Sequence, residues 1–227
     1  GLDDGKDQSY FLYQLNQEQL SKALFPIGEL QKSEVREIAK KNGLITAGKK
    51  DSQGLCFVGK ISLPTFLQQK LSPINGNVVE IPDNLEMFRK YSLIEPTKEN
   101  IVELANPFIY SPEMGTIVTE HIGAHYYTIG QRRGLKIGGR PEPSFVIGID
   151  IPSNTVYSGM KDSHPGLNKF ALKIEKNDFH FVSKHHNDKS LDGITLSVMI
   201  RYRQSFQEGS LHVKDDGYYV LFKEMQR

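Results

Sequence analysis

The sequence has no tryptophan and only one cysteine, Cys56, in 227 residues. A single cysteine cannot form an intramolecular disulfide, and this predicts a reducing compartment such as the cytoplasm. No apolar run approaches the roughly 18 residues that a membrane-spanning helix needs, so we expect no membrane partner. The net charge of +1 excludes binding to nucleic acid through bulk positive charge alone, but it does not exclude local basic patches.

The rest of the composition is typical of a globular protein, with 38% hydrophobic and 24% charged residues. The first 75 residues predict short helices. Asn16 is the expected N-cap of one helix and Ser33 the expected N-cap of a second, and a third is expected from residue 62 onward. The buried stripe of the second helix is expected to comprise Val35, Ile38 and Ala39. A helix-turn-helix reader is a rival interpretation, although the apolar connection at 25–30 is longer than the turn of that motif.

From Gly76 onward the pattern changes to short strands and tight turns, typical of a barrel or a sandwich. Segment 83–114 interrupts this pattern as an insertion, with a helix capped by Thr97 and with Ile101 and Leu104 facing inward. The fold class predicted is therefore α+β, with a helical part at 1–75, a β-rich connection at 76–144 and a β domain at 145–227. The expected strands are 77–81, 145–150, 155–158, 194–202, 211–213 and 218–222, the last two joined by a hairpin turn at 215–217.

Cys56 admits two interpretations. A lone cysteine before Phe57 and Val58 is commonly a small buried hydrophobe. A reactive thiolate instead requires a lowered pKa, and Lys49 and Lys50 upstream could supply the positive charge. No histidine lies nearby in the sequence, so a cysteine–histidine protease would need a distant base.

The histidines do not predict a metal centre. His121 and His125 have the spacing of two ligands on one helical face, but Gly123 and the β pattern argue against a helix there. No glutamate stands in the position that metalloproteases use. We therefore predict no metal and interpret both histidines, together with the His185-His186 pair, as structural or solvated.

Two basic segments are candidates for contacts with phosphate. The glycine-rich loop at 130–139 matches neither a P-loop nor a dinucleotide fingerprint, but it carries Arg132 and Arg133. On a continuous strand, Arg201 and Arg203 would share one face and Tyr202 would point the other way. A third polar segment, at 6–8, could complete a dispersed RNA-binding surface.

Five blocks in order resemble the tRNA-specific 2-thiouridylase family. They are GKDQSYFL at 5–12, FPIGEL at 25–30, DSQGLCFVG at 51–59, YTIGQRRGL at 127–135 and RYRQ at 201–204. The resemblance implies a central domain and a C-terminal antiparallel β-barrel similar to a barrel of elongation factor Tu. It implies that an N-terminal domain, which this chain lacks, uses ATP to adenylate the C2 oxygen of the wobble uridine of tRNA.

The resemblance also implies roles for individual residues. Cys56 would carry a persulfide that delivers sulfur to C2, supplied by a cysteine desulfurase or a sulfur-relay protein, and a second cysteine outside this chain would help to release the product. The expected tRNA-binding residues are Lys6, Asp7, Gln8, Arg201 and Tyr202. The possible tRNA-backbone contacts are Arg132, Arg133 and Arg203.

The chain departs from the family pattern in three respects. The adenylating domain's phosphate loop is absent, the usual closing turn after Phe222 is absent, and the insertion at 83–114 is longer than usual. We therefore expect this chain alone to be inactive. The alternative to a sulfurtransferase is a non-catalytic tRNA-binding module of a divergent relative, in which Cys56 is merely structural.

Overall fold

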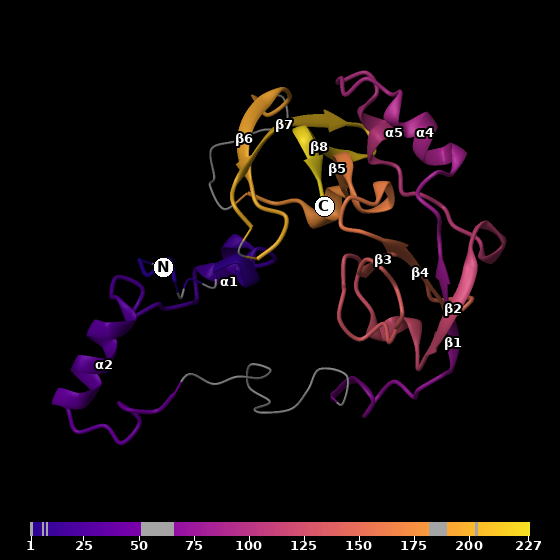
Figure 1. Ribbon diagram of the computed structural model, residues 1–227. Helices are drawn as coiled ribbons and strands as arrows, with labels where there is room; N and C mark the ends of the chain where they lie inside the picture. The colour runs from indigo at the N-terminus through magenta and orange to yellow at the C-terminus, as the bar shows by residue number, and fades with distance from the viewer. Residues whose placement is uncertain (1, 6, 8, 51–65, 182–189, 203) are drawn as a thin grey trace.

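The computed structural model describes residues 2–5, 7, 9–50, 66–181, 190–202 and 204–227. It contains short helices and two four-stranded sheets, so the predicted α+β class is confirmed (Figure 1). Among the described residues, no helix is long and apolar enough to cross a membrane.

The first sheet has the strand order β2-β1-β4-β3. Neighbouring strands are antiparallel except β1 and β4, which run parallel with Val78 opposite Val156. Val78 and Val79 are both fully buried although they point to opposite faces, because each face of this sheet has its own hydrophobic cluster. The strands are β1 (Gly76–Glu80), β2 (Thr116–His121), β3 (Ser144–Asp150) and β4 (Thr155–Met160).

The second sheet is antiparallel throughout, with the order β5-β8-β7-β6. Its central hairpin turns where predicted, since Lys214 pairs with Gly217 across the turn. In the described part of the chain the strand pairing leaves both sheets open at their edges. The strands are β5 (Lys169–Ile174), β6 (Ile194–Val198), β7 (Gln207–Lys214) and β8 (Gly217–Gln226).

Strand pairing shows where one sheet ends and the other begins. We placed a boundary between 144 and 145, but this position lies in β3, which pairs with β4 and through it with β1. Strand pairing separates the sheets between Met160 and Lys169 instead. The long strand expected at 194–202 ends at Val198.

Segment 83–114 forms the joint between the two sheets. It contains α4 (Glu86–Ser92), α5 (Ile101–Ala105) and the 3-10 turn η2 (Pro112–Met114). Ile101 and Leu104 are fully buried as predicted, whereas the N-cap of α5 is Asn100 and not Thr97. Phe108 packs against the cluster on the first sheet and also against the cluster on the second.

A hydrogen-bonded tyrosine reinforces this joint. The Tyr91 hydroxyl donates to the carbonyl of Leu104 at 3.1 Å and accepts from the N–H of Phe170 at 2.9 Å. The hydroxyl thus ties α4 to α5 and to β5. Three further 3-10 turns are η3 (Ala124–Tyr126), η4 (Pro165–Leu167) and η5 (Lys176–Asp178).

The N-terminal elements are η1 (Ser9–Leu12), α1 (Gln17–Leu20) and α2 (Lys32–Lys41). Asn16 caps α1 as predicted, because its side chain accepts from the N–H of Gln19 at 3.0 Å. The prediction of Ser33 as a cap is wrong. Helix α2 begins at Lys32, and the N–H of the N-cap residue Gln31 donates to Glu34 at 2.6 Å.

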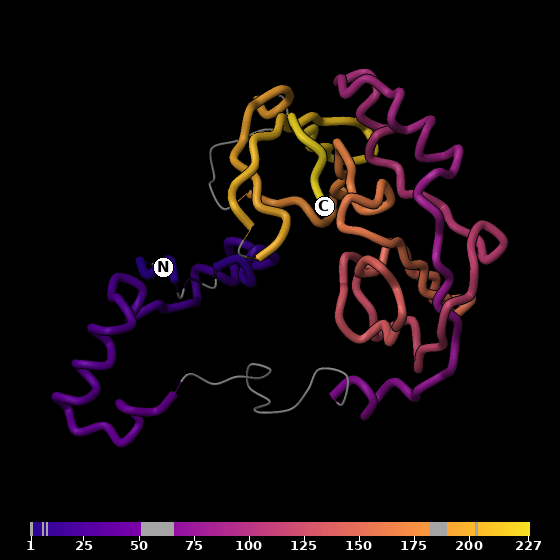
Figure 2. Tube along the Cα trace, viewed as in Figure 1, coloured from indigo at the N-terminus to yellow at the C-terminus, as the bar shows by residue number. Residues whose placement is uncertain are grey.

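The predicted buried stripe on α2 is also wrong. Ile38 is 49% exposed, and Val35 and Ala39 are only partly buried. In Figure 2, α2 extends away from the two sheets, and none of its residues is buried. The third expected helix begins outside the described residues.

Replacing Phe108 with alanine should destabilise both sheets together, because its ring belongs to both clusters. We expect a loss of about 2–3 kcal/mol in the free energy of unfolding. Urea denaturation followed by circular dichroism measures it. The control is Ile109→Ala, since Ile109 is 72% exposed; this change should cost less than about 0.5 kcal/mol. Equal losses for the two variants would contradict the role of Phe108.

Candidate nucleic-acid interface

Two segments far apart in the sequence meet at one surface. The hydroxyl of Tyr10 donates to the carbonyl of Ile200 at 3.0 Å, across 190 residues. The hydroxyl of Tyr202 donates to the carbonyl of Asp7 at 3.4 Å. The structure therefore brings the block at 5–12 next to the block at 201–204.

Aromatic rings fill this junction. The rings of Phe11 and Tyr202 lie 4.9 Å apart between centroids, and those of Tyr10 and Tyr202 lie 6.0 Å apart. We call Tyr10, Phe11, Tyr13 and Tyr202 the aromatic cluster. Phe11 is 60% exposed and Tyr13 is 63% exposed. Exposed rings of this kind offer flat faces for stacking.

Asp7 is fixed within this junction. The N–H of Ser9 donates to its carboxylate at 2.7 Å, and this hydrogen bond holds the pKa of Asp7 below its ordinary value. Asp7 is therefore negatively charged at neutral pH. The same hydrogen bond fixes the turn before η1.

Arg201 is half-buried against a glycine of the basic loop. A Cβ added at Gly130 would lie 2.8 Å from the nearest nitrogens of the Arg201 guanidinium, and Gly130 has a φ of +81°. The loop is held to β3, since the N–H of Gly130 donates to Val146 at 2.7 Å and the N–H of Val146 donates to Gln131 at 2.9 Å. Glycine at 130 thus allows a third predicted block, at 127–135, to reach the surface.

A second arginine, Arg227, lies beside the first. Its guanidinium donates to the carbonyl of Gly130 at 3.5 Å and stacks 4.1 Å from the centroid of the Phe145 ring. Burial lowers the pKa of Arg201, and the positive charge of Arg227 acts in the same direction. Both remain charged at neutral pH because a guanidinium does not lose its proton in proteins. Within the described part of the chain, neither forms an ion pair with a carboxylate.

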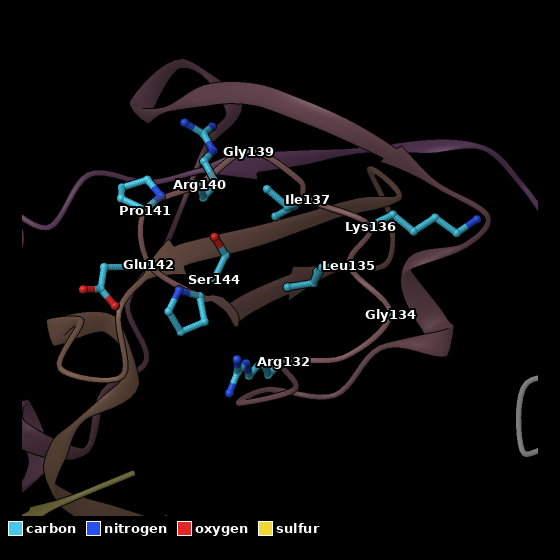
Figure 3. Close-up of a pocket in the computed structure, with 11 residues that line it drawn as sticks. Arg132, Gly134, Leu135, Lys136, Ile137, Gly139, Arg140, Pro141, Glu142 and Ser144 are labelled. Atoms are coloured by element: carbon cyan, nitrogen blue, oxygen red, sulfur yellow. The ribbon is translucent and has the colours of Figure 1, made fainter.

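The basic loop contributes further cations on the neighbouring face. Arg132, Lys136 and Arg140 line a cavity of about 490 Å³, shown in Figure 3. Arg140 is neutralised by Glu80 at 3.1 Å, whereas Arg132 and Lys136 have no carboxylate partner among the described residues. Arg133 lies on the same loop and is exposed.

The side chain of Gln131 holds the basic loop in its conformation. The side-chain oxygen of Gln131 accepts from the N–H of Thr128 at 3.1 Å, and its side-chain nitrogen donates to the carbonyl of Arg133 at 2.8 Å. The oxygen and the nitrogen of the side-chain amide are therefore both hydrogen-bonded within the loop. Gln131 stabilises the loop and is not assigned to ligand binding.

Several expected site residues lie outside the described residues: Lys6, Gln8, Cys56 and Arg203. The strand geometry that we expected for Arg201 is wrong, because β6 ends at Val198 and Arg201 follows in a bend. Arg201 is positioned by Gly130 and not by strand alternation.

The histidine that ends β2 lies inside the fold. His121 is buried, and its Nδ1 accepts from the N–H of Gly123 at 2.9 Å. Burial lowers the pKa of His121 and so favours the neutral ring. No group of three or more His, Cys, Asp or Glu in the described ranges is arranged to hold a metal ion.

The sequence did not single out two cations at this surface, Arg227 and Lys169. Arg227 follows a strand whose pattern gave no sign of a site. Lys169 begins β5, where one lysine among alternating residues is ordinary. Its ammonium lies 4.0 Å from the centroid of the Phe108 ring, and burial lowers the pKa of Lys169 to about 8.

The fold and the site define an α+β protein with exposed rings and unpaired arginines on one surface. Residues 1–60 match the family model described as the tRNA methyl transferase HUP domain. Residues 98–160 match that described as the tRNA methyl transferase PRC-barrel domain.

Relatives named tRNA-specific 2-thiouridylase MnmA match the whole chain. Those from Christiangramia forsetii and Flavobacterium johnsoniae are each 48% identical over 227 residues, which is 100% of this chain and 58% of the relative. One from Streptococcus pyogenes serotype M2 is 39% identical over 231 residues, covering 52% of the relative. The chain belongs to the tRNA-specific 2-thiouridylase family and spans little more than half the length of these relatives.

Replacing Gly130 with alanine should strain the loop and displace Arg201. The positive φ of Gly130 and the short distance from an added Cβ to the guanidinium both oppose a side chain. We expect a loss of about 1–3 kcal/mol in the free energy of unfolding, measured by urea denaturation. Gly138→Ala is the matched control, because a Cβ at Gly138 meets nothing within 4 Å. If both variants were equally stable, the close packing of Arg201 on Gly130 would be refuted.

Proposed function

We propose that the whole protein is a tRNA-uridine 2-sulfurtransferase, and that this chain provides its sulfur-carrying cysteine and much of its tRNA-contacting surface. The names of the relatives support the activity. The main structural support is the meeting of three sequence blocks, where Tyr202 contacts Asp7 and Arg201 packs on Gly130.

The surface suits an RNA strand for two physical reasons. Exposed rings stack on bases of any identity, and the aromatic cluster offers Phe11 and Tyr13 for this purpose. Unpaired arginines bind phosphate oxygens through planar, bidentate contacts. We assign tRNA binding to Lys6, Asp7, Gln8, Arg201 and Tyr202, and backbone contacts to Arg132, Arg133 and Arg203.

The proposed reaction begins outside the described residues. ATP adenylates the C2 oxygen of the uridine, and pyrophosphate leaves. No described segment is a glycine-rich phosphate loop between a strand and a helix, so we assign ATP binding to the remainder of the protein.

Sulfur then passes through Cys56. Its thiolate takes the outer sulfur of a donor protein's persulfide, which leaves the donor as a thiol. The terminal sulfur of the Cys56 persulfide attacks C2, and AMP departs with the original oxygen. A second cysteine thiol attacks the resulting disulfide, which yields 2-thiouridine and a Cys–Cys disulfide that a thiol reductant restores. This chain has one cysteine, so the second thiol belongs to the remainder of the protein or to a partner.

Replacing Arg201 with alanine should weaken tRNA binding by the full-length protein. If Arg201 contacts one phosphate, the slope of log affinity against log salt should fall by about 0.7–0.9. Filter binding or fluorescence anisotropy at several salt concentrations measures both quantities. Arg89→Ala is the control, because Arg89 is exposed on α4, where it pairs with Glu86. An unchanged salt slope for Arg201→Ala would remove Arg201 from the interface.

Cys56 should gain the mass of one sulfur atom when the full-length protein is incubated with a cysteine desulfurase and cysteine. The adduct should be removed by a thiol reductant and should be absent in Cys56→Ser, which should also leave tRNA uridine unmodified. Peptide mass spectrometry and nucleoside analysis measure these results. Intact tRNA binding without any adduct would support the non-catalytic alternative, in which Cys56 is structural. A methylated nucleoside in place of a thiolated one would overturn the proposed activity.

A further inference from the structure

A cleft of about 430 Å³ opens where the two sheets meet. This volume is within the usual range for small-molecule sites. Its walls come from β3, β5, β8 and segment 107–109, and Figure 1 shows these strands converging near the C-terminus. Most of its lining is apolar, including the buried side chains of Ile147, Leu167 and Phe222.

Three cations line this apolar cleft, and no acidic residue does. They are Lys169, Arg201 and Arg227. None of the three forms an ion pair with a carboxylate elsewhere in the described residues. The Nε atom of Arg227 is buried and has no hydrogen-bond partner in the described structure. Positive charge concentrated in apolar surroundings is costly without an anion, so the cleft is poised to accept one.

The ammonium of Lys169 lies over aromatic rings in the wall of the cleft. Its ammonium contacts the rings of Phe108 and Tyr91 at 4.0 and 5.0 Å and donates a hydrogen bond to the carbonyl of Asn106. No negative charge offsets its burial, and its pKa is lowered to about 8.

The cleft is continuous with the surface assigned to RNA. Arg201 lines the cleft and packs on Gly130, and its neighbour Tyr202 belongs to the aromatic cluster. Ile200 also lines the cleft and accepts the hydrogen bond of Tyr10. A strand that stacks on the aromatic cluster would therefore pass the mouth of the cleft.

We propose that this cleft binds a nucleoside phosphate, with the base against the apolar lining and the phosphate against Lys169, Arg201 and Arg227. The apolar walls can pack against the faces of a base, and the three positive charges can attract the negative charge of a phosphate. The nucleotide is either free or one residue of an RNA strand that turns inward. The second case rests on the proposed function, whereas the first does not.

Binding of uridine monophosphate to the full-length protein tests the cleft directly. We expect the monophosphate to bind at least tenfold more tightly than uridine, and Arg227→Gln to weaken it about tenfold, by isothermal titration calorimetry. Lys173→Met is the matched control for removal of a cation from β5, since Lys173 is outside the cleft lining, and it should leave this affinity unchanged. Equal affinity for uridine and its monophosphate, or full affinity in Arg227→Gln, would overturn the proposal.

Lys169→Met separates a ligand-binding lysine from a structural one. Methionine keeps the packing on Phe108 and removes an unpaired charge, so this variant should have a higher urea midpoint and yet bind the monophosphate at least fivefold more weakly. A lower midpoint together with unchanged binding would mark Lys169 as structural and refute its role in the cleft.

The pH dependence gives a second readout for Lys169. Its protonated form attracts phosphate, so wild-type affinity should be retained at pH 7 and fall as pH rises through about 8. The other ionisable groups near it keep their charge state over this range, because Arg201 and Arg227 stay protonated and burial raises the pKa of Tyr91. In Lys169→Met this pH dependence should vanish, and its persistence would refute the assignment.

Binding to tRNA then identifies the source of the nucleotide. If Arg227→Gln weakens both the monophosphate and tRNA, the cleft holds a nucleotide of the RNA. If it weakens only the monophosphate, the cleft holds a free nucleotide. If tRNA binds normally to the wild type but no monophosphate binds, the cleft proposal fails and the proposed function stands.

Discussion

The packing of Phe108 between two hydrophobic clusters is the contact on which the rest of the structure depends. Its ring meets those of Phe88 and Tyr91 edge-on, at centroid distances of 5.0 and 5.2 Å, and so contacts α4 along most of its length. Each sheet has its own core, and Phe108 of segment 83–114 packs against a cluster on each. Phe108 also lines the cleft between the sheets, and the ammonium of Lys169 lies over its ring.

The second constraint is the placement of positive charge without negative charge. Some cations elsewhere in the described chain are paired, as Lys98 is with Asp192 at 2.8 Å and Lys223 is with Glu208. At the junction of the sheets Arg201, Arg227 and Lys169 are not. Since a chain with a net charge of +1 has nearly equal numbers of acids and bases, this segregation is local and is a property of the fold rather than of composition.

Local patterns in the sequence predicted local structure well. Short apolar runs indicated β1 and β3, the turn residues placed the β7–β8 hairpin, and Asn16 proved to be a cap. Non-local pairing was beyond such patterns. The parallel contact of β1 with β4 joins residues nearly 80 positions apart, and it moves the division between the sheets well past residue 145. Ile38 was misjudged because a helical stripe shows which face is apolar, not whether anything covers it.

The candidate site also has a part that local sequence patterns indicate and a part that depends on non-local contacts. The blocks that contain Asp7, Gly130 and Arg201 could be recognised singly, but their meeting depends on contacts across up to 195 residues. Lys169 and Arg227 carry no local signal, because a cation matters here only when no acid lies near it, and that is a fact of tertiary structure.

Cations without nearby acids explain how a protein of nearly zero net charge could hold RNA. A uniformly basic surface would attract any polyanion and release it readily in salt. Rings at the mouth and unpaired cations in an apolar cleft act differently, because the apolar surroundings strengthen each charge contact and the ring faces add a contribution that salt does not screen. On the proposed function, the surface would hold the RNA in a fixed register while the chemistry at Cys56 proceeds.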